Sequence, residues 1–124
     1  MKKSQFNRPA GFTLVEIMIV VAIIGLLAAI AIPNFVKARA TSQANACINN
    51  LRQIDGAVSQ FALEAHLTTG ASVTFQSDLT PYIKLNAVSS VPACPAGGTY
   101  AVASVGTTPT CTLSSTVTPN HILP

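Results

Sequence analysis

A single carboxylate, Glu16, lies near the start of an apolar stretch that ends at Pro33. The stretch from Ile17 to Ile32 contains no charged or strongly polar side chain. An ionisable group inside such a segment is a functional candidate, because a charge surrounded by hydrocarbon needs a partner. The chemistry available to Glu16 is therefore electrostatic pairing with a positive group. The alternative is a carboxylate that lies at the membrane boundary without a partner.

The positive charges at the start of the chain predict how this segment is oriented. Lys2, Lys3 and Arg8 precede the apolar stretch with no acid among them, and the charges after Gly11 sum to zero. Phe12 to Ile32 forms about 30 Å of helix at 1.5 Å per residue, which matches the hydrocarbon core of a membrane. Cationic flanks stay cytoplasmic, so we predict a single span with its N-terminus inside. No basic surface remains to indicate a nucleic-acid partner.

The junction Gly11-Phe12-Thr13-Leu14-Val15-Glu16 resembles the N-terminal processing motif of type IV pilins and type II secretion pseudopilins. The resemblance covers Lys2 to about Pro33. It consists of a short basic leader, a Gly and a Phe at the junction, a Glu, a long apolar run and a Pro.

The resemblance implies that a prepilin peptidase cleaves between Gly11 and Phe12 and methylates the new amine of Phe12. It also implies a homopolymeric filament, with related minor pilins and an inner-membrane assembly platform as partners. The precursor would lie in the bacterial inner membrane, and the assembled filament would be periplasmic or extracellular. The chain would be a structural subunit and a substrate of the peptidase, with no enzymatic activity and no cofactor.

Cleavage would create a positive partner for Glu16. In parallel helices staggered by one or two turns, the carboxylate of one subunit can meet the Phe12 amine of the next. At 4 Å and an effective dielectric constant of 20, such a pair gains about 4 kcal/mol before desolvation. Because burial of two charges offsets much of this gain, the pair sets register more than net stability.

Several functions stay open on the sequence alone. The filament is either a pilus or a pseudopilus, since both share the motif. A monomeric, membrane-anchored periplasmic binding domain that never polymerises is the main alternative. The loose A-x-A pattern within Ala28 to Ala31 also permits a signal peptide that is cut to release a soluble protein.

The remaining elements predict an α+β, pilin-like fold. We expect residues 1–11 to be a leader, 12–33 a membrane or filament-core helix, and 34–124 a head that includes the second half of the helix. The helix should run from Phe12 to about Leu67, with a kink at Pro33. Its second half carries one apolar stripe at three- and four-residue steps, which needs a cover. That stripe is Cys47/Ile48, Leu51, Ile54, Val58, Phe61 and Ala65.

The cover is predicted to be a small antiparallel sheet. Strands are expected at 99–103 and 110–113, joined by a Gly106–Pro109 connection, with a third strand near 73–75 and a short helical turn at 78–83. So small a head needs additional support.

Cysteines are the expected support for the head. Cys94 and Cys111 flank the proposed hairpin, so a disulfide between them is predicted; a pairing of Cys47 with either is the alternative. An odd count leaves one free thiol, which we expect to be Cys47. No C-x-x-C or H-x-x-x-H spacing occurs, so no metal site is predicted. His121 is expected at the surface or in packing.

Overall fold

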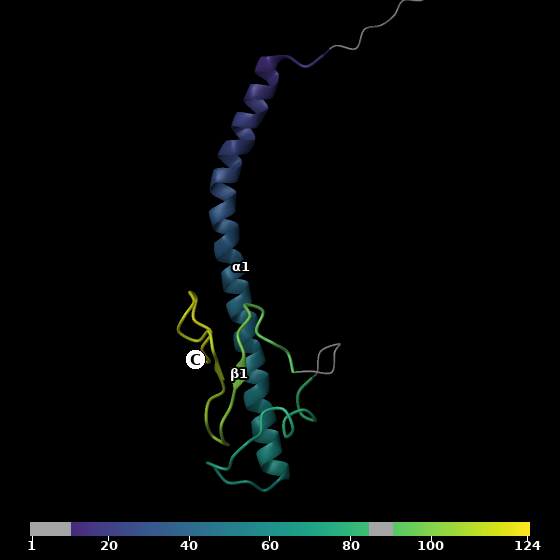
Figure 1. Cartoon of the computed structure of the whole chain (residues 1–124), viewed down its shortest axis with the longest axis vertical. Helices are drawn as coiled ribbons and strands as arrows, with labels where there is room; N and C mark the ends of the chain where they lie inside the picture. The colour runs from purple at the N-terminus through teal and green to yellow at the C-terminus, as the bar shows by residue number, and fades with distance from the viewer. Residues whose placement is uncertain (1–10, 85–90) are drawn as a thin grey trace, which may run out of the picture. The chain divides into compact units, whose positions relative to one another are not determined.

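The computed structural model describes residues 11–84 and 91–124. It contains one long helix, α1 (Leu14–Glu64), and two short strands, β1 (Tyr100–Ala101) and β2 (Thr110–Cys111) (Figure 1). This confirms the predicted α+β class, with a long N-terminal helix and a small antiparallel sheet. The chain divides into two compact units, Met1–Val36 and Lys37–Pro124. The leader bases Lys2, Lys3 and Arg8 lie outside the described residues.

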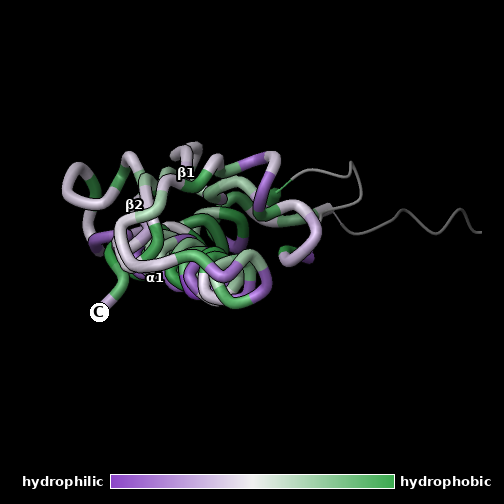
Figure 2. The backbone as a smooth tube through the Cα atoms, turned by 90° about the horizontal axis from the view of Figure 1, so that it is seen from below, coloured by the Kyte–Doolittle hydropathy of each residue, from purple (hydrophilic) through white to green (hydrophobic). Residues whose placement is uncertain are grey.

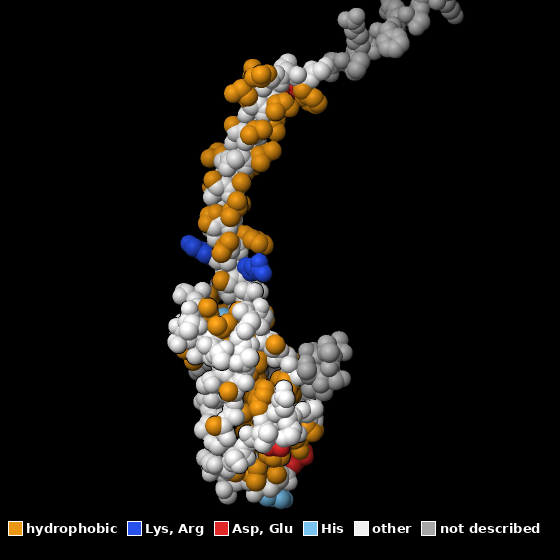
Figure 3. All heavy atoms as spheres, viewed as in Figure 1, with side chains coloured by type: hydrophobic (Ala, Val, Ile, Leu, Met, Phe, Trp, Pro, Cys, Tyr) orange, Lys and Arg blue, Asp and Glu red, His pale blue; other side chains and the backbone are white. Residues whose placement is uncertain are grey.

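The first unit contains the apolar start of α1. None of residues 11–36 is buried, and large apolar side chains from Phe12 to Val36 are about half exposed or more. Figure 3 shows apolar side chains along the visible face of this part of the helix. Pro33 lies inside α1, which continues beyond it. The kink there stays a prediction.

The second unit begins with the amphipathic part of α1. Its buried residues recur at three- and four-residue steps, as a helix with one apolar face requires. They are Ala44, Cys47, Leu51, Ile54, Ala57 and Val58. This confirms most of the predicted stripe, although Phe61 is half-buried and Ala65 is exposed. Small alanines extend the buried face because they let the covering segments approach closely.

The helix ends in a Schellman motif. His66 adopts a left-handed backbone conformation with φ of 51°. The Leu67 N–H donates to the Ala62 carbonyl at 2.8 Å, and the His66 N–H donates to the Leu63 carbonyl at 3.4 Å. These two bonds satisfy carbonyls that the last turn would otherwise leave without donors. The helix therefore ends within three residues of the predicted position.

The sheet is an antiparallel pair in which Tyr100 faces Cys111 and Ala101 faces Thr110. Both strands are shorter than predicted. The third strand predicted near 73–75 is wrong: Ser72 forms an isolated bridge with Ser104, and the chain then turns. The Val73 N–H still donates to the Ala103 carbonyl at 3.2 Å, so this segment is attached to the sheet for only a few residues.

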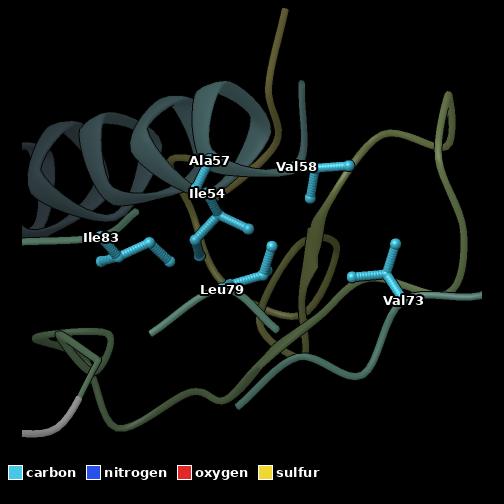
Figure 4. Packing of buried hydrophobic residues seen from close by; sticks show 6 residues of the cluster. All are labelled: Ile54, Ala57, Val58, Val73, Leu79 and Ile83. Atoms are coloured by element: carbon cyan, nitrogen blue, oxygen red, sulfur yellow. The ribbon is translucent and has the colours of Figure 1, made fainter. Parts of the chain in front are cut away.

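Two apolar clusters join α1 to its cover. In the first, Ile54 faces Leu79 from the turn region, and the cluster also contains Ala57, Val58, Val73 and Ile83 (Figure 4). The second unites Cys47 and Leu51 of α1 with Cys94 and Cys111. Consistent with these contacts, β1 and β2 lie beside α1 in the end-on view (Figure 2). The amphipathic half of the helix is thus covered by the rest of its own unit.

Candidate functional site: the helix start and a buried thiol cluster

The start of α1 is closed by a reciprocal pair of hydrogen bonds. The Glu16 N–H donates to Thr13 Oγ1 at 3.2 Å, and the Thr13 N–H donates to Glu16 Oε2 at 3.4 Å. This is a capping box, in which residues three apart satisfy two of the free donors at a helix start. This box was not among the predicted features, although the T-x-x-E pattern that signals it is present in the sequence.

The capping box gives Glu16 a role inside its own chain. Its carboxylate bends back toward the helix start, next to the peptide that the resemblance marks for cleavage. Gly11 and Phe12 precede the helix, and the Phe12 side chain is 80% exposed. The junction is therefore accessible, and the helix beyond it is already capped at Thr13.

The apolar part of α1 is long and apolar enough to cross a membrane, by length and composition. Its most apolar window contains no buried residue. A signal sequence near an N-terminus shares these two properties. The position of Glu16 at the first turn of this segment places the carboxylate near one end of the apolar surface.

A second candidate site lies in the head, where the three cysteines and one histidine meet. The ligand atoms of Cys47, Cys94, Cys111 and His121 all lie within 4.8 Å of one another. All four residues are buried, and His121 is 2% exposed. Of the two positions expected for His121, at the surface or in packing, the structure shows the second, and it places His121 beside the three cysteines. Short spacings could not indicate this cluster because its members come from four separate segments.

The cysteines are free thiols in this arrangement. Cys94 and Cys111 are close together, but no bond joins them, and Cys47 lies in the same cluster. The Cys94 Sγ and His121 Nδ1 atoms are 3.4 Å apart. A disulfide between Cys94 and Cys111 stays a prediction, with the other two pairings as its alternatives.

The turn after Cys94 is shaped by two glycines. The Gly97 N–H donates to the Cys94 carbonyl at 2.9 Å, and Gly97 has φ of +89°, a conformation that favours glycine. A Cβ on Gly98 would lie 2.7 Å from Cys111 Sγ and 3.0 Å from Leu113 Cγ. The Cys-Pro-Ala-Gly-Gly sequence therefore allows the turn to approach the sulfur of Cys111.

Polar groups from outside the cluster influence the pKa values of two of the thiols. Asn50 Nδ2 donates to Tyr100 Oη at 3.0 Å, which leaves the tyrosine hydroxyl proton to face Cys47. Burial raises the pKa of the Cys47 thiol to about 12, although the Tyr100 hydroxyl opposes this shift. Burial also acts to raise the pKa of Cys94. There the backbone N–H groups of Ala96 and Gly98, with the other two thiols, outweigh burial and hold the pKa below its ordinary value.

Comparisons with known proteins agree with the N-terminal motif. A family model described as the prokaryotic N-terminal methylation motif matches residues 6–32. The chain is 54% identical over 65 residues to the type IV major pilin protein PilA of Myxococcus xanthus (strain DK1622), a match that covers 52% of this chain and 30% of that one. It is 48% identical over 54 residues to the type IV major fimbrial protein FimA of Dichelobacter nodosus, which covers 44% of this chain and 35% of that one.

One relative matches across most of the chain. The type II secretion system core protein G of Escherichia coli (strain K12) is 26% identical over 109 residues, covering 81% of this chain and 75% of that one. No solved structure matches the chain. The matches to the two pilins span about a third of their length. The chain carries the prokaryotic N-terminal methylation motif, and its homologues are type IV pilins and a type II secretion pseudopilin.

Proposed function

We propose that the chain is a structural subunit of a type IV pilus or of a type II secretion pseudopilus. The observation that carries this proposal is the exposed apolar surface of residues 12–36, which the head does not bury. Such a surface has to be covered by a membrane or by other chains. The family motif and the relatives support a membrane in the precursor and other subunits in the filament.

The processing step follows the motif. We propose that prepilin peptidase cleaves after Gly11 in the inner membrane and methylates the Phe12 amine, with the leader cytoplasmic. The exposure of Gly11 and Phe12 ahead of α1 supports this step, because a protease needs an extended and accessible peptide. Cleavage there leaves the apolar helix intact, so the product stays in the membrane until assembly.

Glu16 would then act in assembly. We propose that its carboxylate meets the Phe12 amine of a neighbouring subunit. The pairing gains about 4 kcal/mol before desolvation at 4 Å and an effective dielectric constant of 20. Loss of a helix cap costs typically about 1 kcal/mol. The pairing energy exceeds the cost of losing the cap. The carboxylate can therefore leave its capping position for the amine only where desolvation of the two charges costs less than the difference between these two free energies.

The mass of the N-terminal peptide, measured on protein recovered from its native envelope, tests the processing. N-methylated Phe12 is the expected result. A peptide that begins at Met1 or Lys2 would contradict processing, and a start beyond Ala31 would identify a released, soluble protein. Recovery of the protein in sheared surface fibres identifies a pilus. Loss of protein secretion on deletion identifies a pseudopilus.

Two substitutions of Glu16 separate assembly from capping. Glu16→Gln keeps the capping box, in which Gln serves as well as Glu, but removes the charge. Glu16→Ala removes both. We expect both variants to lose filament assembly to a similar degree, as measured by the fraction of subunit in sheared or pelleted filaments. Glu64→Gln, the same change at the other end of α1, is the control and should assemble normally.

Each other outcome has a distinct meaning. If Glu16→Gln assembles normally and Glu16→Ala does not, Glu16 acts only as a helix cap and the pairing is wrong. If the wild-type protein itself stays a membrane monomer and neither variant differs from it, the chain is an anchored binding domain.

A further inference from the structure

We propose that Cys47, Cys94, Cys111 and His121 form a structural Zn²⁺ site that fastens the head to α1. The site is independent of filament assembly, since all four ligands belong to the unit Lys37–Pro124. Three thiolates and one imidazole are an ordinary ligand set for structural zinc. The four side chains contribute one ligand atom each, so the set is complete without a water or a substrate.

The distances between the ligand atoms fit a tetrahedral ion. Bonds of about 2.3 Å to sulfur and about 2.0 Å to nitrogen put neighbouring sulfurs about 3.8 Å apart, and sulfur and nitrogen about 3.5 Å apart. The observed separation of Cys94 Sγ and His121 Nδ1 is 3.4 Å. Because no pair exceeds 4.8 Å, the separation of two ligand atoms has to shorten by at most about 1 Å for two sulfurs and about 1.3 Å for sulfur and nitrogen to match tetrahedral positions.

The surroundings suit a charged metal centre. Zn²⁺ with three thiolates carries one net negative charge, which hydrogen-bond donors to sulfur offset. Tyr100 packs against the cysteines and accepts a bond at its hydroxyl from Asn50 Nδ2, and the backbone of Ala96 and Gly98 lies next to Cys94. Such outer partners orient metal ligands and are a regular part of metal sites.

Zinc is favoured over a disulfide because it would use His121 as well as all three cysteines. A disulfide would use two of the sulfurs and would leave a buried thiol and a buried imidazole without a role. A metal uses all four groups. Tetrahedral sulfur-rich coordination selects Zn²⁺ among the common divalent ions. The ligands come from α1, the turn before β1, strand β2 and the C-terminal segment, so one ion would tie four segments of the head together.

The first experiment measures the metal content of the full chain, purified in mild detergent without chelators and with a thiol reductant. Elemental analysis after gel filtration should give one zinc per chain. His121→Asn should remove most of the zinc, whereas His66→Asn, the same change at the other, exposed histidine, should retain it. A zinc content near zero in the wild-type chain after addition of Zn²⁺ would overturn the proposal.

The second experiment tests the site in the wild-type chain, so that it does not depend on whether His121→Asn folds. Co²⁺ replaces Zn²⁺ in tetrahedral sites and gives absorption bands that report thiolate ligands. Addition of Co²⁺ to the metal-free chain should produce a sulfur-to-cobalt band, which Zn²⁺ should abolish. His121→Cys supplies a fourth sulfur and should restore binding with a stronger band. A normal band in His121→Asn would overturn the assignment of His121.

The third experiment uses alkylation to decide between metal and disulfide. In protein isolated from the native envelope without reductant, all three cysteines should resist alkylation until the metal is chelated, and all three should then react. If a disulfide joins any two cysteines instead, only one thiol reacts after denaturation, and the zinc site is wrong. Free reaction of all three thiols before chelation would also exclude it.

Discussion

The two units of this chain contain similar residues and use them in opposite ways. Residues 11–36 include no buried side chain, whereas the head buries two residues of the same helix, α1: Ile54 packs against Leu79, and Leu51 packs in the cluster of the three cysteines. The difference does not lie in helix formation, which both share. It lies in whether the chain supplies a cover: the head does so from residues that follow the helix, whereas the apolar side chains of the first unit stay exposed.

Truncation of one leucine in each unit should show the largest contrast. Leu51→Ala removes a fully buried side chain and should lower the free energy of unfolding of the head by about 2–5 kcal/mol. Leu26 is 66% exposed, so Leu26→Ala should change it by less than about 0.5 kcal/mol. Thermal unfolding of the full chain in detergent, followed by circular dichroism, measures both. Equal effects would show that the first unit contributes to the stability of the head.

Substitution of two glycines of the head by alanine should change its free energy of unfolding in opposite directions. An added Cβ at Gly98 meets Cys111 Sγ at 2.7 Å, so Gly98→Ala should destabilise the head by about 1–3 kcal/mol. Gly56 lies within α1 and has no atom within 4 Å of an added Cβ, so Gly56→Ala should stabilise it by about 0.5–1 kcal/mol. Denaturant titration measures both. Unchanged stability in Gly98→Ala would indicate that the turn near Cys94 is looser than described.

The smallest expected effect is a pH dependence from one acid of the head. The Thr74 N–H donates to Asp78 Oδ2 at 2.8 Å, and Ser77 Oγ donates to Oδ1 at 2.9 Å. These bonds, the backbone one first, hold the pKa of Asp78 below its ordinary value of 3.8. The group therefore contributes its full stabilisation above pH 3.8, which is lost as the pH falls through the folded-state pKa.

Thermal unfolding measured at about pH 2 to 6 shows whether the stability of the head falls as the pH is lowered, as expected. Asp78→Asn should flatten the acid side of the stability profile. Asp55→Asn, the same change on α1, should leave the pH dependence of the free energy of unfolding unchanged. A profile that is identical in wild type and Asp78→Asn would show that the carboxylate contributes no stability through these bonds.

Local patterns predicted the local structure well. The apolar start and the amphipathic second half of α1 follow from residue spacing, because helix contacts join residues three and four positions apart. The capping box also has a local signature, T-x-x-E, so Thr13 and Glu16 were within reach of the sequence. The absence of the third strand could not be predicted from the sequence. Two or three Val and Thr residues favour a strand, but they do not show whether a partner segment is long enough to pair with it.

The sequence by itself determined the processing motif, the apolar helix and the balance of charge, all of which depend on residues close together in the chain. Only the tertiary structure showed that the three cysteines lie together with a histidine. Cys47, Cys94, Cys111 and His121 are separated by long stretches of chain and follow no ligand spacing. They meet because α1 buries Cys47 beneath β2 and the turn of Gly97 and Gly98, a packing arrangement that no local pattern encodes.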